Sequence, residues 1–247
     1  MKHLIIRSLA IALLGFIPTQ VLAVEFAVVG PRAAGMGGAG VAVTTDALAT
    51  YWNPAGLAMT QTVDIRIQAT GQGVDRLGVR QTLDDIKNFT PGNATAAQGL
   101  ADRINGGTVS AAAAGGLYFK GHFGEHAFGF NVSDVATGGA FVDPNNRFRQ
   151  VGGNVQGAFL LRGLEARQAA FSYAYAFADK TFAIGVTAKA IQGAAYAGSA
   201  TVTGGQDVTL TDNLGKAKLS SAFSVDVGAI YRPTSWLRFG EIGRAHV

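Results

Sequence analysis

The sequence predicts an all-β fold: a transmembrane antiparallel β-barrel, incomplete in this chain, with an N-terminal segment and short helices in one loop. Three observations point to this fold class. Hydrophobic residues make up 48% of the chain and charged residues only 15%, and glycine is abundant with 34 residues. After the first 23 residues, no apolar run reaches the length of a membrane helix. Several segments instead alternate bulky and small side chains with the period of two that β-strands require.

The N-terminus is expected to be a secretory signal peptide, residues 1–23. Lys2 and Arg7 precede the apolar run Leu9–Ile17, and Val21 and Ala23 fit a signal-peptidase site. We therefore expect an exported protein. Zero cysteines exclude disulfides, thiol nucleophiles and thiolate metal sites. Without the signal peptide, 18 basic residues face 16 acidic ones, so we expect no direct binding of nucleic acid.

Strand alternation is clearest in a hairpin around the turn at 178–180. The bulky face of this hairpin carries Phe171, Tyr173, Tyr175, Phe177, Phe182, Ile184 and Val186. The opposite face is mostly alanine, glycine and serine, and residues 63–68, 126–133 and 222–231 repeat the pattern. A soluble β-sandwich would also alternate, but its second face meets water and usually carries lysine, glutamate and threonine. We therefore favour a barrel whose bulky face contacts lipid and whose small face lines a crowded lumen.

Two short helices and an unusual ending interrupt the strand pattern. Residues 82–89 and 94–107 are expected to be helical, because apolar side chains recur there at i, i+3 and i+4. Long polar connections at 143–157 and 198–216 alternate with tight turns, as in outer-membrane barrels. The ending EIGRAHV, residues 241–247, resembles the translation of a sequencing adaptor and lacks a terminal aromatic residue. We expect it to be a non-native tail.

The stretch GMGGAG, residues 35–40, spells the G-x-G-x-x-G pattern of a dinucleotide-binding loop. Such a site needs the first glycine at the end of a buried strand and a helix that opens within the motif. Here four residues separate Gly30, which ends a strand-like run, from Gly35. The following segment begins with β-branched residues, Pro54 interrupts it, and no second βαβ unit follows. We therefore predict no nucleotide cofactor and assign the glycines to close packing of backbone.

The same region resembles a known superfamily. Residues 30–43 (GPRAAGMGGAGVAV), 46–47 (DA) and 51–58 (YWNPAGLA) are similar to the N-terminal signature of FadL-like outer-membrane barrels. The helical segment 82–89, directly after the first strand, is more similar to the barrel-type conjugal transfer protein TraF family than to the fatty-acid transporters. A thioredoxin-like protein shares the TraF name but would need cysteines, so only the barrel family fits.

The resemblance implies an outer-membrane location and an N-terminal hatch, residues 24–61, inside a partial barrel, residues 62–240. The implied hatch residues are Gly35, Gly37, Gly38, Asn53 and Pro54. The glycines would pack against the wall, the asparagine would hydrogen-bond strands or hatch backbone, and the proline would fix a turn. Three functions follow as hypotheses: passage of a hydrophobic solute, a structural role in a conjugation or secretion apparatus, and a secreted β-sandwich adhesin. The expected partners are outer-membrane lipid and either hydrophobic small molecules or components of that apparatus.

Three charged residues fall on the small face of their strands: Arg66, Lys189 and Asp226. Inside a barrel they are expected to pair with each other or with hatch groups, because unpaired charge is costly away from water. Their expected role is structural, with ligand binding as the alternative. No catalytic constellation is present, and His122 and His126 lie in a glycine-broken stretch that does not suit a metal pair. We therefore expect neither an enzyme nor a metal or cofactor.

Overall fold

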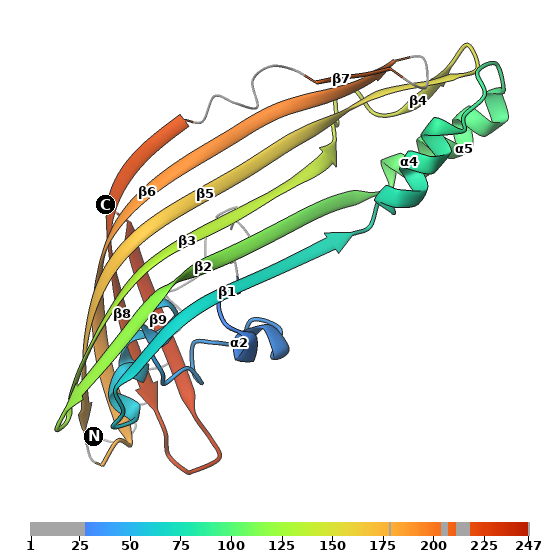
Figure 1. Cartoon of the computed structure of the whole chain (residues 1–247). Helices are drawn as coiled ribbons and strands as arrows, with labels where there is room; N and C mark the ends of the chain where they lie inside the picture. The colour runs from blue at the N-terminus through green and yellow to red at the C-terminus, as the bar shows by residue number, and fades with distance from the viewer. Residues whose placement is uncertain (1–27, 178, 204–206, 211–217, 247) are drawn as a thin grey trace, which may run out of the picture.

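The computed structural model describes residues 28–177, 179–203, 207–210 and 218–246, so the expected signal peptide lies outside the described ranges. The predicted antiparallel β-structure is confirmed as one sheet curled into a half-barrel (Figure 1). The main path runs β1-β2-β3-β5-β6-β8-β9, while β4 pairs with β5 and β7 with β6. The strands are β1 Asp64–Asp75, β2 Thr108–Phe123, β3 His126–Val142, β4 Arg149–Val151, β5 Asn154–Phe177, β6 Phe182–Thr203, β7 Asp207–Leu210, β8 Lys218–Tyr231 and β9 Phe239–His246.

The two faces of the sheet differ in the way that the alternation predicts. On β5, Phe171 is 57% exposed on the convex face, whereas Ser172 and Ala174 are fully buried on the concave face. The same alternation runs through the paired strands, where Ile184 and Val227 are exposed and their sequence neighbours are buried. In the part of the sheet near the short turns, the large apolar side chains therefore point outward and the small and polar side chains point inward.

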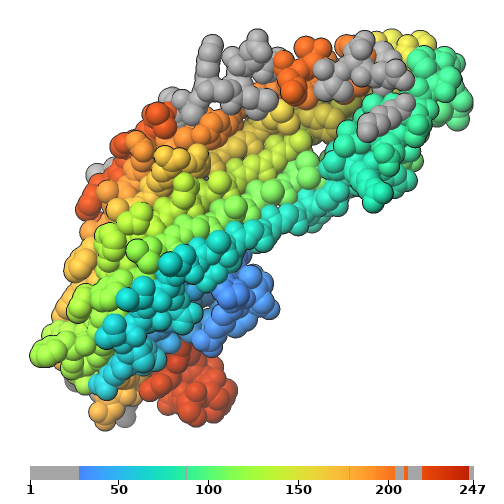
Figure 2. Space-filling view, in the orientation of Figure 1, coloured from blue at the N-terminus to red at the C-terminus, as the bar shows by residue number. Residues whose placement is uncertain are grey.

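The N-terminal segment lies against the concave face near the end of the sheet that carries the short β2–β3 and β5–β6 turns (Figures 1 and 2). It contains α2 Pro31–Gly35, α3 Ala49–Trp52 and the 3₁₀ helix η1 Pro54–Met59. All six residues of η1 are buried. They pack with the small wall side chains Ala127, Ala174, Ala176 and Ala183 and with Ile230. Because the wall side chains are short, the hatch backbone can approach the sheet closely.

The two predicted helices are present at the opposite end of the sheet, as α4 Val79–Lys87 and α5 Ala94–Asn105 (Figure 1). The predicted apolar side of α5, including Leu100 and Ile104, is buried against Phe148 and Val155. Among the described residues, no helix is long and apolar enough to cross a membrane. The domain boundaries, including a non-native tail at 241–247, stay predictions; in the structure β9 pairs antiparallel with β8.

Candidate functional site

Asn53 and Pro54 form the point at which the hatch meets the wall. Asn53 is completely buried, and its Oδ1 accepts a hydrogen bond from the backbone N–H of Ala55 at 3.1 Å, which caps η1. Its Nδ2 donates to carbonyl oxygens of the hatch and of two strands: Val41 at 3.1 Å, Ala229 at 3.1 Å and Glu241 at 3.2 Å. Pro54 follows as the first residue of η1, where its missing N–H costs nothing. One amide side chain therefore ties the hatch to β8 and β9.

Glycines of the wall make this contact possible, and sequence reasoning did not identify them. A Cβ atom at Gly228 would lie 2.0 Å from Asn53 Oδ1, and one at Gly185 would lie 2.6 Å from the backbone of Pro54. These two glycines face each other across β6 and β8. A Cβ at Gly129 on β3 would lie 2.4 Å from a methyl group of the hatch residue Thr50. The available sequence signal was their position on the small face of their strands.

The glycines of GMGGAG do not all act as the sequence suggests. A Cβ added at Gly35 or Gly37 would meet open space, and one at Gly38 would make only an ordinary contact with Val28. Gly37 and Gly38 instead adopt positive φ angles, which favour glycine, and therefore shape a turn. The close approach falls on Gly40, where a Cβ would lie 2.1 Å from the Trp52 ring. Only the last glycine of the motif is thus required for tight packing.

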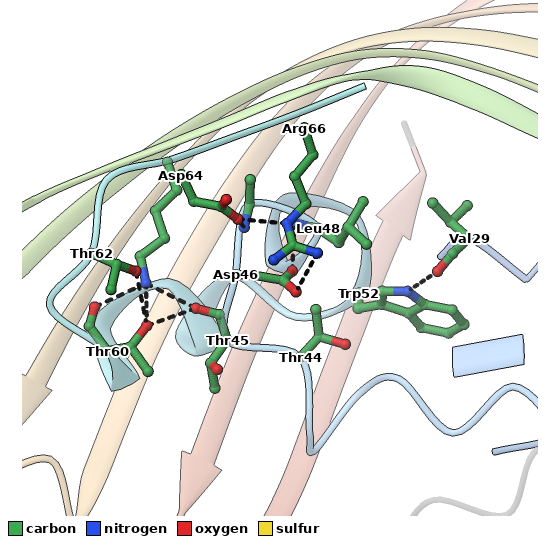
Figure 3. Close-up of polar contacts among 12 residues, drawn as sticks. Val29, Thr44, Thr45, Asp46, Leu48, Trp52, Thr60, Thr62, Asp64 and Arg66 are labelled. Carbon is green, nitrogen blue, oxygen red and sulfur yellow. Dashed lines mark hydrogen bonds and ion pairs between the residues drawn. The ribbon is translucent and has the colours of Figure 1, made fainter. Parts of the chain in front are cut away.

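On the other side of the hatch, acidic and basic side chains tie it to β1 (Figure 3). Arg66 pairs with Asp46 of the hatch at 3.3 Å and with its strand neighbour Asp64 at 2.7 Å. Asp64 Oδ2 also accepts a hydrogen bond from the backbone N–H of Ala47 at 2.9 Å. Arg66 therefore contacts the hatch, and it does so together with two acidic residues that sequence reasoning did not select.

A buried lysine on β2 continues this anchor. The Lys120 side chain donates from Nζ to the carbonyl oxygens of Thr45 at 2.8 Å and Thr60 at 2.9 Å, and to Thr60 Oγ1 at 2.6 Å. Lys120 is fully buried, and these three acceptors of its ammonium group all belong to the hatch. Its place on the small face of β2 was the only sequence signal for this role.

Lys189 and Asp226 form an ion pair on neighbouring strands β6 and β8, away from Arg66. Both are buried, with side-chain exposures of 5% and 1%. Arg244 on β9 lies 3.6 Å from Asp226 and donates to the backbone oxygen of the hatch residue Tyr51 at 3.1 Å. Burial raises the pKa of the Tyr51 hydroxyl above its usual value, against the opposing charge of Arg244. The structure therefore places hatch-directed charges on both sides of the half-barrel.

One small cavity lies next to the hatch. The cavity between the hatch and β1–β2 holds about 30 Å³, roughly the volume of one water molecule. It is lined by Val28, Ala34, Thr70, Gly71, Gln72 and Ala112–Ala114. Within the described residues, no group of three or more histidine, aspartate or glutamate side chains is placed to hold a metal ion. The described geometry is that of a segment held against a wall.

The end of the hatch and most of the strands lie in a region that a family model matches. The family model described as the F plasmid transfer operon TraF protein matches residues 50–244, which include Asn53, Pro54, Arg66, Lys189 and Asp226. No curated protein and no solved structure matches the chain. Because the family match spans well over half of the sequence, the chain belongs to the family of the F plasmid transfer operon protein TraF.

Proposed function

We propose that this chain is part of the wall of an outer-membrane β-barrel, and that it serves as a structural component of a conjugation or secretion apparatus with its hatch closed. The observation that carries the membrane part of the proposal is the inverted distribution of side chains. The convex face exposes phenylalanine, isoleucine, leucine and valine, while lysine, aspartate and asparagine are buried on the concave face. A water-soluble β-protein arranges these residue types the other way round.

The exposed apolar surface is continuous from strand to strand. One register row crosses the convex face through Ile65, Phe119, Phe130, Phe171 and Ala188. A contiguous apolar surface of this extent is unusual for a soluble monomer, but it is what hydrocarbon requires. Aromatic side chains also gather near the short turns, where Phe177, Phe182, Tyr231 and Phe239 lie in one row. Such aromatic girdles are typical of a membrane–water interface.

The hatch contacts support the structural role over solute passage. Movement of the hatch would break the three hydrogen bonds of Lys120, those of Asn53 to β8 and β9, and the ion pair of Arg66 with Asp46. The adjoining cavity of about 30 Å³ is also too small for a hydrophobic solute. A hatch that is bonded to both sides of the wall is consistent with a closed component of a larger assembly.

Passage of a hydrophobic solute is the second candidate, in keeping with the resemblance to FadL-like barrels. One observation favours it: beyond the hatch, the concave face carries Phe141, 38% exposed, and Leu164, 40% exposed. These side chains would form an apolar lining for a solute bound on the concave face beyond the hatch. A secreted adhesin, the third hypothesis, requires the exposed convex face to meet a protein partner in place of lipid.

Cell fractionation and affinity purification test these alternatives. The proposal predicts that the chain sediments with the outer membrane, migrates faster on gels before heating than after it, and copurifies with other envelope proteins. Leu164→Asp separates the two leading functions, because it alters the concave lining without touching the hatch. The structural role predicts unchanged copurification and no fatty-acid binding by either form. Fatty-acid binding that Leu164→Asp abolishes would establish passage, and a soluble, heat-insensitive protein would exclude the membrane.

A further inference from the structure

The convex face changes character partway along its strands, at a cluster of four polar side chains that we call the polar row: Asp134, Glu165, Arg167 and Tyr196. Arg167 pairs with Asp134 on β3 at 3.1 Å and with Glu165 at 2.6 Å. The Tyr196 hydroxyl on β6 donates to Glu165 at 3.1 Å. Arg167 and Asp134 are separated by an even number of residues from the exposed Phe171 and Val132, so they share the convex face.

The convex face exposes bulky apolar residues mainly on one side of the polar row. Toward the short turns, the convex face carries large apolar side chains that are all more than two-fifths exposed: Val132, Phe130, Phe128, Phe171, Tyr173, Ile184, Val186, Phe223 and Val227. Toward α4 and α5, most convex positions of β1, β2 and β3 are glycine and alanine, including Gly71, Gly73, Ala111, Ala113 and Ala136. The bulky convex residues Val142, Val155, Phe159 and Val202 on this side pack in the cluster that contains the apolar side of α5. Lipid contact is therefore favoured on one side of the row only.

The length of the bulky region fits one membrane. From Phe177 at the short turn to Arg167 is a rise of ten residues along β5. At about 3.3 Å per residue and a tilt of roughly 40°, this stretch spans about 25 Å along the barrel axis, the height of a typical outer-membrane apolar band. The remaining stretch of β5 from Arg167 to Asn154 adds about 33 Å by the same geometry.

We propose that the polar row marks the border of the hydrocarbon, and that the sheet beyond it stands in water and carries α4 and α5 about 30 Å away from the membrane. The inference rests on the proposed membrane location and adds where the membrane ends. Strands that only cross a bilayer need about 9–11 residues, whereas β5 has 24 and β6 has 22. The additional strand length therefore forms a wall outside the membrane, which contacts water and envelope components.

Thiol labelling tests the border directly, because the native chain has no cysteine. Two single variants place a thiol at an exposed convex position on either side of the polar row. Phe171→Cys lies on the side of the short turns, and Ala111→Cys lies on the side of α4 and α5. The full chain in phosphatidylcholine nanodiscs is treated with a water-soluble maleimide, and the same reaction in urea gives the reference rate. We expect Ala111→Cys to react roughly tenfold or more faster than Phe171→Cys in nanodiscs, because only a hydrated thiol ionises, and equally in urea.

The outcomes separate this inference from the proposed function. Rapid labelling of both thiols would mean that the convex face meets water throughout, and the membrane location itself would fail. Protection of both thiols would leave the membrane location standing and overturn the border. Arginine substitutions give a second readout: Phe171→Arg should lower the folded fraction in nanodiscs roughly thirtyfold or more, whereas Ala111→Arg should leave it unchanged. Equal loss in both variants would also overturn the border.

Discussion

The contact between Gly228 and the hatch leads to a sharp prediction about a single methyl group. The substitution Gly228→Ala adds a Cβ atom that would lie 2.0 Å from Asn53 Oδ1 and 3.0 Å from Pro54 Cδ. The first distance is far below a van der Waals contact, and β8 cannot retreat because it pairs on both sides. The hatch must therefore move away from the wall.

The expected cost follows from two effects. Overpacking of a well-filled site costs about 1–3 kcal/mol. Displacement of Asn53 also breaks its bonds to the wall residues Ala229 and Glu241, each of which contributes about 1 kcal/mol. Together, Gly228→Ala should lower the free energy of unfolding by about 3–5 kcal/mol. The matched control is Gly193→Ala on β6, where the nearest atom to the new Cβ lies at 3.7 Å, and its effect should stay within about 1 kcal/mol.

Urea unfolding in phosphatidylcholine vesicles measures both changes through tryptophan fluorescence. The chain has two tryptophans, so Trp236→Phe as background leaves Trp52, which is buried in the hatch, as the single reporter. Combining Gly228→Ala with Asn53→Ala should cost less than the sum of the two single changes, because the clashing oxygen is gone. Equal stability of Gly228→Ala and the Gly193→Ala control would refute the close hatch contact.

Three other predictions concern buried polar groups. Lys120→Met should destabilise the chain by about 2–4 kcal/mol in the same urea assay, because its three hatch acceptors lose their donor; an unchanged midpoint would contradict the anchor. Lys189→Met alone should cost about 3–5 kcal/mol, whereas adding Asp226→Leu should recover most of the loss, and a further loss would refute the pairing. Tyr51 should stay protonated above pH 10, because its raised pKa favours the neutral folded form until pH exceeds that pKa. The ultraviolet difference between the native chain and Tyr51→Phe measures this, and ionisation at pH 10 would contradict burial.

The strands and helices could be predicted because their signals are local. Phe171 and Tyr173 alternate with Ser172 and Ala174 within one segment, and the sheet keeps that alternation. The helix with Leu100 was likewise predictable from the spacing of its apolar residues. These patterns need no knowledge of which strands become neighbours.

The hatch contacts could not be predicted in the same way, because they join residues far apart in the chain. Asn53 bonds to Ala229, 176 positions away, and nothing near Gly228 in the sequence distinguishes it from other small-face residues. The register that brings Lys189 beside Asp226 is equally invisible in either strand alone. Gly37 shows the opposite error. It belongs to a conspicuous local motif and was predicted to pack against the wall, but in the structure it adopts a positive φ angle and shapes a turn.

The most direct test of the proposed orientation compares two isoleucines in the intact chain. Ile184 is 43% exposed on the convex face, and Ile230 is fully buried between wall and hatch. In phosphatidylcholine nanodiscs, nuclear Overhauser transfer from lipid acyl-chain protons should reach the Ile184 methyl groups and leave those of Ile230 unaffected. Transfer from water, and none from lipid, to Ile184 would contradict the membrane-facing convex surface.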